Sequence, residues 1–83
     1  MIDAELCQAI GSVLTTCDGR PATTRAIAAY VRPYVRTAAS VADVQATLLH
    51  LEKHGDVDRE ADRDDKTLLS WFLTDAGKRR FPA

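Results

Sequence analysis

The spacing of apolar residues changes near Gly55, and this change limits the possible folds more than any other feature of the sequence. Before Gly55, a stripe of apolar residues recurs every three or four positions, as on one helix face: Val41, Val44, Leu48 and Leu51. Further along, apolar residues alternate as on one face of a strand: Leu69, Trp71 and Leu73. The chain is therefore expected to fold as an α+β protein, with helices first and a β-hairpin after them.

Three helices are expected in the first two thirds of the chain, over about residues 3–17, 23–35 and 40–54. The inner face of the second helix is expected to contain Ile27 and Val31, with Tyr30 as a third candidate. Pro33 predicts an end or a kink in this helix, because proline lacks the amide hydrogen and disfavours a helical residue before it.

Short polar side chains stand where these helices are expected to begin. Asp3 fits the N-cap of the first helix, and Thr23 or Thr24 fits that of the second. Ser40 with Asp43 resembles a capping box, with aspartate in place of the usual glutamate or glutamine. These signals place the start of each helix.

The last third of the chain is expected to form a hairpin over about residues 56–73 and a short basic helix over about 74–81. Gly55 fits the C-cap of the preceding helix, because glycine adopts the left-handed conformation at low cost. The two strands, about 56–60 and 66–73, flank the polar run ADRDD.

Two phrases of the sequence resemble MarR- and PadR-type bacterial regulators. LLHLEKHGDVDRE is similar to their passage from recognition helix into wing, and WFLTDAGKRRF is similar to the segment that closes the wing. The matching positions are Leu48, Leu51, Glu52, Gly55, Val57, Arg59, Trp71, Leu73, Thr74 and Gly77. The resemblance implies one winged-helix domain over residues 1–83, with a three-helix helix-turn-helix core, a β-hairpin wing and a short C-terminal helix. It also implies a small bacterial or phage protein that binds double-stranded DNA and regulates transcription.

Two residues of the hairpin carry further expectations. Trp71 is expected to anchor the hairpin in the core. Asp56 departs from the family phrase, where an apolar residue usually precedes the valine, so a shallower core or a polar contact is expected there.

The net charge of −1 hides a strong segregation of charge along the chain. Residues 20–42 contain four arginines and no acid, a charge of +4, whereas residues 43–66 contain eight acidic against four basic residues, a charge of −4. Because local fields act on a partner more strongly than the total does, the near-neutral sum does not exclude nucleic acid.

The third helix supplies the candidates for reading bases in the major groove. If its apolar stripe faces inward, an outward set remains: Ala42, Asp43, Gln45, Ala46, Thr47 and His50. Glutamine can pair with adenine, and threonine can contact a base or a methyl group. Asp43 has a second interpretation as a helix cap, and the set contains no arginine.

Candidates for phosphate contacts lie in the second helix and in the wing: Thr23, Thr24, Arg25, Arg32, Arg36, Arg63 and Lys66. The alternative is an ordinary arginine-bearing surface helix, together with a wing tip whose mixed charges are only solvated.

A rival hypothesis is a winged-helix protein–protein interaction module that uses its acidic wing and outer sheet face without binding DNA. Leu68 and Phe72 would form its partner patch, because alternation sends them to the outer face of the sheet unless helix 1 or residues 81–83 cover them. A homodimer is a further expectation.

No catalytic set, phosphate-binding loop or cofactor motif is present in the sequence, so we expect neither an enzyme nor a cofactor. His50 and His54 have the spacing of metal ligands, but no neighbouring residue completes a zinc pattern, so no metal is expected. Cys7 and Cys17 lie about 15 Å apart along one helix, too far for a disulfide, and are interpreted as small core residues. The absence of a signal pattern and of a membrane span favours the cytoplasm.

Overall fold

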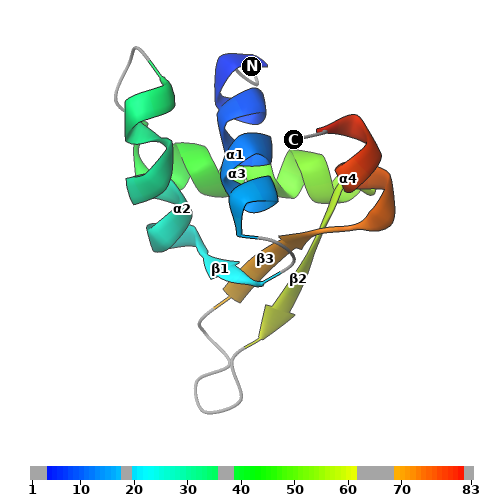
Figure 1. The fold of residues 1–83 in the computed structure, drawn as a ribbon. Coiled ribbons are helices and arrows are strands. Elements are labelled where there is room, and N and C mark those ends of the chain that lie inside the picture. The colour runs from blue at the N-terminus through cyan, green and yellow to red at the C-terminus, as the bar shows by residue number, and fades with distance from the viewer. Residues whose placement is uncertain (1–3, 18–19, 36–38, 62–68, 82–83) are drawn as a thin grey trace.

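The computed structural model describes residues 4–17, 20–35, 39–61 and 69–81. Within them the chain forms a winged helix with its elements in this order: α1 (Ala4–Thr16), β1 (Ala22–Thr23), α2 (Thr24–Val31), the 3₁₀ turn η1 (Arg32–Tyr34), α3 (Val41–Lys53), β2 (Val57–Ala61), β3 (Leu69–Leu73) and α4 (Asp75–Arg80) (Figure 1). This confirms the predicted α+β winged-helix class. Five residues named above lie outside the described ranges: Asp3, Arg36, Arg63, Lys66 and Leu68.

Side-chain caps start the later helices where the sequence predicts them. The Thr23 hydroxyl accepts a hydrogen bond from the amide of Ala26 at 3.2 Å, so Thr23, not Thr24, caps α2. Ser40 and Asp43 form the predicted capping box, each side chain accepting from the backbone amide of the other at 3.1 Å. Each bond satisfies an amide that has no partner within its helix.

The helix ends follow from one proline and one glycine. α2 ends at Val31, and the chain continues as a single 3₁₀ turn containing Pro33, as expected from the missing amide. α3 ends at Lys53, and Gly55 follows with φ of +81°. Only glycine adopts this conformation at little cost, so Gly55 reverses the chain from α3 into β2.

The sheet contains one strand that the sequence did not reveal. Its order is β1-β3-β2, all antiparallel, with Ala22 opposite Trp71 and Thr23 opposite Ser70. The sequence analysis assigned only a helix cap to the segment leading into α2, and so it missed β1. A strand of two residues is too short to show an alternating pattern in the sequence. β1 forms because the free edge of β3 is available for pairing.

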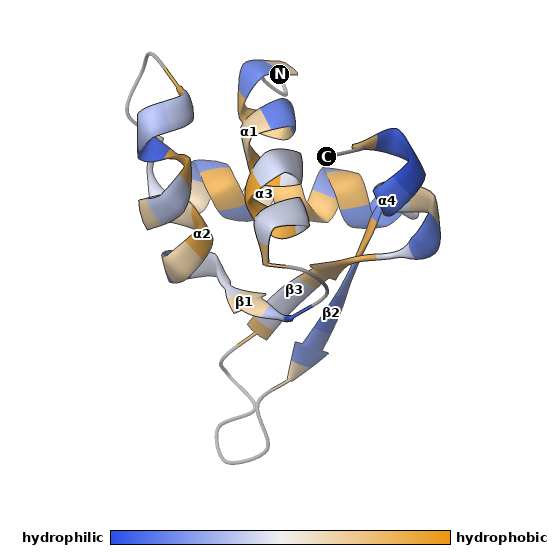
Figure 2. Cartoon of the chain, viewed as in Figure 1, coloured by the Kyte–Doolittle hydropathy of each residue, from blue (hydrophilic) through white to orange (hydrophobic). Residues whose placement is uncertain are grey.

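β3 lies in the middle of the sheet and carries the largest core side chain. Trp71 is fully buried, as predicted, among the inward faces of all three long helices and the sheet: Leu6, Ile10, Leu14, Ile27, Val31, Val44, Leu48, Leu51, Val57 and Leu73. Figure 2 shows these apolar segments facing one another in the middle of the molecule. None of the described helices is long and apolar enough to cross a bilayer.

A close backbone contact joins α4 to the start of the hairpin. Thr74 donates its amide hydrogen to the Asp56 carbonyl at 3.1 Å, and a Cβ on Gly77 would overlap that same oxygen. The buried Asp56 carboxylate pairs with Arg80, with 3.5 Å between Oδ2 and Nε. The predicted polar contact at Asp56 is therefore present, and glycine is required at position 77.

Phe81 packs under α1 and not on the outer face of the sheet. The Phe81 ring is buried against Gly11 of α1, where an added side chain would overlap it. Phe72 lies on the opposite side of the sheet and is half-buried. The possibility that Phe81 covers Phe72 is therefore wrong, because the ring fills the core beneath α1.

Two predicted inward-facing residues face solvent. Val41 is 44% exposed and Tyr30 is 56% exposed. The buried stripe of α3 consists of Val44, Thr47, Leu48 and Leu51. The first turn of α3 therefore lies at the edge of the core, and Val41 remains largely exposed there.

Candidate nucleic-acid interface

The side of α3 turned away from the core is exposed and has little charge. The exposed residues of α3, apart from Asp43 of the capping box, define what we call the α3 outer face: Val41, Ala42, Gln45, Ala46, Leu49 and Lys53. Leu49 is 42% exposed, although leucine usually packs inside. At 3.6 residues per turn, Ala42, Ala46 and Leu49 point opposite to the buried stripe, and Gln45 lies at one margin.

Three of the predicted base-reading residues, Ala42, Gln45 and Ala46, lie on this face. Thr47 does not: it is 2% exposed, and its hydroxyl donates to the Asp43 carbonyl at 2.9 Å. The outward placement of Thr47 is therefore wrong, because this bond satisfies the hydroxyl inside the core. Asp43 is exposed, but its carboxylate serves the capping box.

His50 faces a different part of the surface. It follows Gln45 by five residues, about 140° around the helix, and is half-buried. Its ring meets that of His54 edge-on, with centroids 4.5 Å apart, beside a groove of about 450 Å³ that Cys7 and Gln8 of α1 also line. No group of three or more His, Cys, Asp or Glu side chains suited to a metal ion gathers in the described part of the chain.

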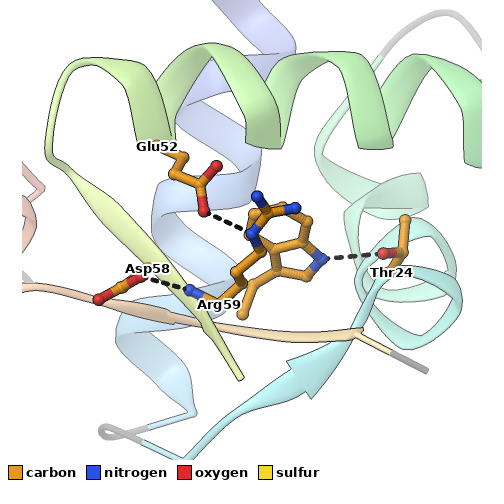
Figure 3. Close-up of polar contacts among 5 residues, drawn as sticks. Thr24, Glu52, Asp58 and Arg59 are labelled. Carbon is orange, nitrogen blue, oxygen red and sulfur yellow. Dashed lines mark hydrogen bonds and ion pairs between the residues drawn. The ribbon is translucent and has the colours of Figure 1, made fainter. Parts of the chain in front are cut away.

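A chain of polar contacts connects β3, α2 and α3. The Trp71 indole donates from Nε1 to the hydroxyl of Thr24 at 2.9 Å, and that hydroxyl lies 3.5 Å from Oε1 of Gln45, a long hydrogen bond in which it is the donor. Figure 3 shows Thr24 at the end of the first of these contacts. Thr24 is buried, so the prediction that it faces phosphate is wrong. Instead, it directs the oxygen of Gln45 toward α2 and leaves the amide NH₂ group to face outward.

α2 and the turn that follows it present basic side chains, and the first of them, Arg25, follows Thr24, which contacts Gln45 of the α3 outer face. Arg25 and Arg32 are exposed and seven residues apart, so they lie on the same side of the helix. Neither forms an ion pair with any described residue. Tyr30 and Tyr34 are 56% and 59% exposed, and sequence analysis missed both as surface residues. The sequence feature that pointed to their exposure was Pro33, because the 3₁₀ turn that contains it ends the inward face of α2.

The first strand of the hairpin is bound to α3 through a pair of charges. Nε of Arg59 lies 3.1 Å from Oε2 of Glu52, and the backbone amide of Arg59 donates to the Asp58 carboxylate at 2.8 Å (Figure 3). The Glu52–Arg59 pair could not be predicted from the sequence, because it forms only when Gly55 turns the strand back along the helix. Arg59 is thereby held by the fold.

The outer face of the sheet is acidic. Strand alternation and the register place Asp58 opposite Phe72 and Glu60 opposite Ser70 on the side away from Trp71. Of the predicted partner patch, Phe72 lies on this face, and Leu68 is outside the described residues. The exposed residues of β2 and α4 are hydrophilic (Figure 2).

Comparison with known proteins places the fold. A scan against protein-family models gives no match, and a search of curated proteins gives none. Solved structures do match: the transcriptional regulator PA4135 (TM-score 0.78, 18% identity, 95% of this chain and 52% of that chain), YusO of Bacillus subtilis (0.75, 18%, 92% and 48%) and FabT of Streptococcus pneumoniae in complex with DNA (0.72, 16%, 96% and 50%).

These neighbours are winged-helix structures of MarR-family transcriptional regulators, which confirms the fold that the sequence resemblance implied. At these identities the likeness shows the fold alone. The chain spans about half the length of the structures it matches.

Proposed function

We propose that this chain is a DNA-binding transcriptional regulator that inserts α3 into the major groove of duplex DNA. The observation that carries the proposal is the exposed α3 outer face together with Arg25 and Arg32, which pair with no acid among the described residues. In a helix-turn-helix, the first helix crosses the phosphate backbone and the second helix enters the major groove. In this chain, α2 corresponds to the first of these helices and α3 to the second. FabT, which has this fold, was solved in complex with DNA.

The residues divide into two roles under this proposal. Ala42, Gln45 and Ala46 face the base edges. Arg25 and Arg32 contact phosphates, which position a protein on the duplex without specifying sequence. We add Arg36, Arg63 and Lys66 as further phosphate contacts on the strength of their sequence positions alone.

The proposed activity is binding, not catalysis. Structural neighbours such as PA4135 are transcriptional regulators, which favours a protein that is not an enzyme. A regulator of this kind acts where the bacterial chromosome lies, in keeping with the expected cytoplasmic location.

Binding to mixed-sequence duplex DNA at several salt concentrations tests the proposal. We expect affinity to fall as salt rises, with a slope of about 0.9 per phosphate contacted. The double variant R25Q/R32Q should bind all sequences more weakly and lose about 1.8 from that slope, because two contacts are removed.

The matched control is K78Q/R79Q, which removes the same charge from exposed positions of α4, on the opposite side of the molecule from α2 (Figure 1). This control variant should keep most of the salt dependence of DNA binding. If the unmodified chain binds no duplex even at low salt, DNA binding is wrong, and the protein–protein alternative takes its place.

A further inference from the structure

We propose that the α3 outer face recognises thymine methyl groups, so that the chain selects A·T-rich sequences in the major groove. This inference rests on the proposed function and adds to it the class of DNA sequence that is bound. It also assigns a role to Val41 and Leu49, which sequence analysis did not place among the base readers.

The first argument is the apolar character of the face. Four of its six residues are apolar, and two of these, Val41 and Leu49, are large and more than two-fifths exposed. By contrast, the exposed residues of α1 include no large apolar side chain: Ala4, Glu5, Gln8, Ser12 and Thr16. Contiguous apolar surface that the fold leaves uncovered marks a contact with a partner.

The second argument is the chemistry of the four bases. In the major groove, guanine is read mainly by arginine or lysine, and cytosine by an acidic acceptor. The middle of the α3 outer face offers neither, because Asp43 serves the capping box and Lys53 lies at the last position of the helix. Thymine presents a C5-methyl group, the apolar feature of the groove, which matches alanine, valine and leucine side chains.

The third argument is the position of Gln45 within this apolar surface. Glutamine pairs with adenine, the partner of thymine. Its amide oxygen is turned toward Thr24, so its NH₂ group is the part that faces outward. An NH₂ donor suits N7 of adenine or O4 of thymine, and equally N7 or O6 of guanine, so Gln45 is compatible with an A·T pair and the methyl contacts make the selection.

The spacing of the apolar residues also fits consecutive base pairs. Ala42, Ala46 and Leu49 extend over seven residues of helix, about 10 Å at 1.5 Å per residue. Base pairs rise by about 3.4 Å, so this length corresponds to about three of them. The small alanine side chains allow the helix to approach the base edges closely, and Leu49 reaches further along the groove.

The flanking charges select DNA over an apolar protein partner as the occupant of this face. Arg25 follows Thr24, which contacts Gln45, and Arg32 lies on the same side of α2; both are exposed and have no acidic partner among the described residues. A phosphate backbone on either side of a groove complements such charges, whereas an apolar helix or sheet does not.

Replacement of thymine by deoxyuridine tests the inference, because uracil lacks only the methyl group. The best-bound duplex is first selected from a random pool, and each thymine of the bound site is then replaced in turn. We expect affinity to fall about fourfold for each methyl group contacted, the value for burying one such group. Deoxyuridine placed in the flanks of the same duplex is the control and should have no effect.

Substitutions in the protein separate direct contact from an effect on DNA shape. L49A and V41A should respond less to deoxyuridine than the unmodified chain does, because the side chain that touched the methyl group is shortened. Both residues are exposed, so the variants should fold normally, which a thermal melt can check. Q8A, an exposed change on α1, is the matched control and should keep the full response.

The outcomes distinguish the two proposals. If the chain binds DNA but neither selects A·T pairs nor responds to deoxyuridine, the inference about methyl groups is wrong and the proposed function stands. If it binds no DNA and another protein covers Leu49 instead, the proposed function fails and the inference fails with it.

Discussion

α2 and the hairpin both display arginines, but they use them in opposite ways. Arg25 and Arg32 of α2 are exposed and pair with no acid among the described residues, so they are available to a partner. Arg59 of β2 is held by Glu52, and Arg80, just beyond the hairpin, is held by Asp56. The same type of side chain is thus available to a partner in one region and held in an internal ion pair in the other. The net charge of the chain cannot show this difference.

The largest expected effect concerns the contact between α4 and the start of the hairpin. G77A should lower the free energy of unfolding by about 3 kcal/mol, because its Cβ would overlap the carbonyl of Asp56 and force α4 off the hairpin. At an ordinary helix position the same change would stabilise by up to about 1 kcal/mol, so the sign itself is informative. Urea denaturation measures it.

The control for this prediction is G55N, because position 55 has a positive φ, which asparagine tolerates, and no atom within 4 Å of an added Cβ. It should cost much less than G77A. Equal stability of G77A and the unmodified protein would show that the contact between α4 and Asp56 is not tight.

A smaller loss of stability is expected where α2 itself serves the core. T24V keeps the shape of Thr24 but removes the hydroxyl that accepts from Trp71, which leaves a buried N–H without a partner. We expect a loss of about 2 kcal/mol in the free energy of unfolding. T24S retains the hydroxyl and should recover most of this stability. A T24V variant as stable as T24S would contradict the role of the Trp71–Thr24 bond.

This bond also illustrates how far the sequence predicts the molecule. The helix starts could be predicted because Ser40, Asp43 and Thr23 act on amides within three residues. The burial of Trp71 followed from alternation along one strand. Neither pattern shows that Trp71 meets Thr24, 47 residues away, because that contact depends on how β1 and β3 pair.

The errors on α3 have a similar origin. Periodicity placed Val41 inside and Thr47 outside, since valine is apolar and threonine polar. The structure reverses them, because the core ends before the first turn of α3 and because Thr47 bonds to the carbonyl of Asp43 four residues earlier. Among the base-reading candidates, Ala42, Gln45 and Ala46 could be placed on the outer face from spacing alone. Leu49 could not, because an exposed leucine contradicts the pattern on which the prediction depends.

The smallest expected effect comes from removing the acidic partner of a hairpin arginine, which leaves that arginine available to a partner as Arg25 is. E52Q removes the partner of Arg59, and an ion pair as exposed as this one contributes only about 0.5 kcal/mol to the free energy of unfolding. In the assay with mixed-sequence duplex DNA, E52Q should bind more tightly than the unmodified chain, because Arg59 can then reach a phosphate. The salt dependence of its affinity should be steeper by up to about 0.9. The double variant E52Q/R59Q separates this gain from the mere loss of an acidic residue near DNA. If the steeper slope persists in the double variant, Arg59 is not the new contact, and Glu52 weakens binding through its own charge.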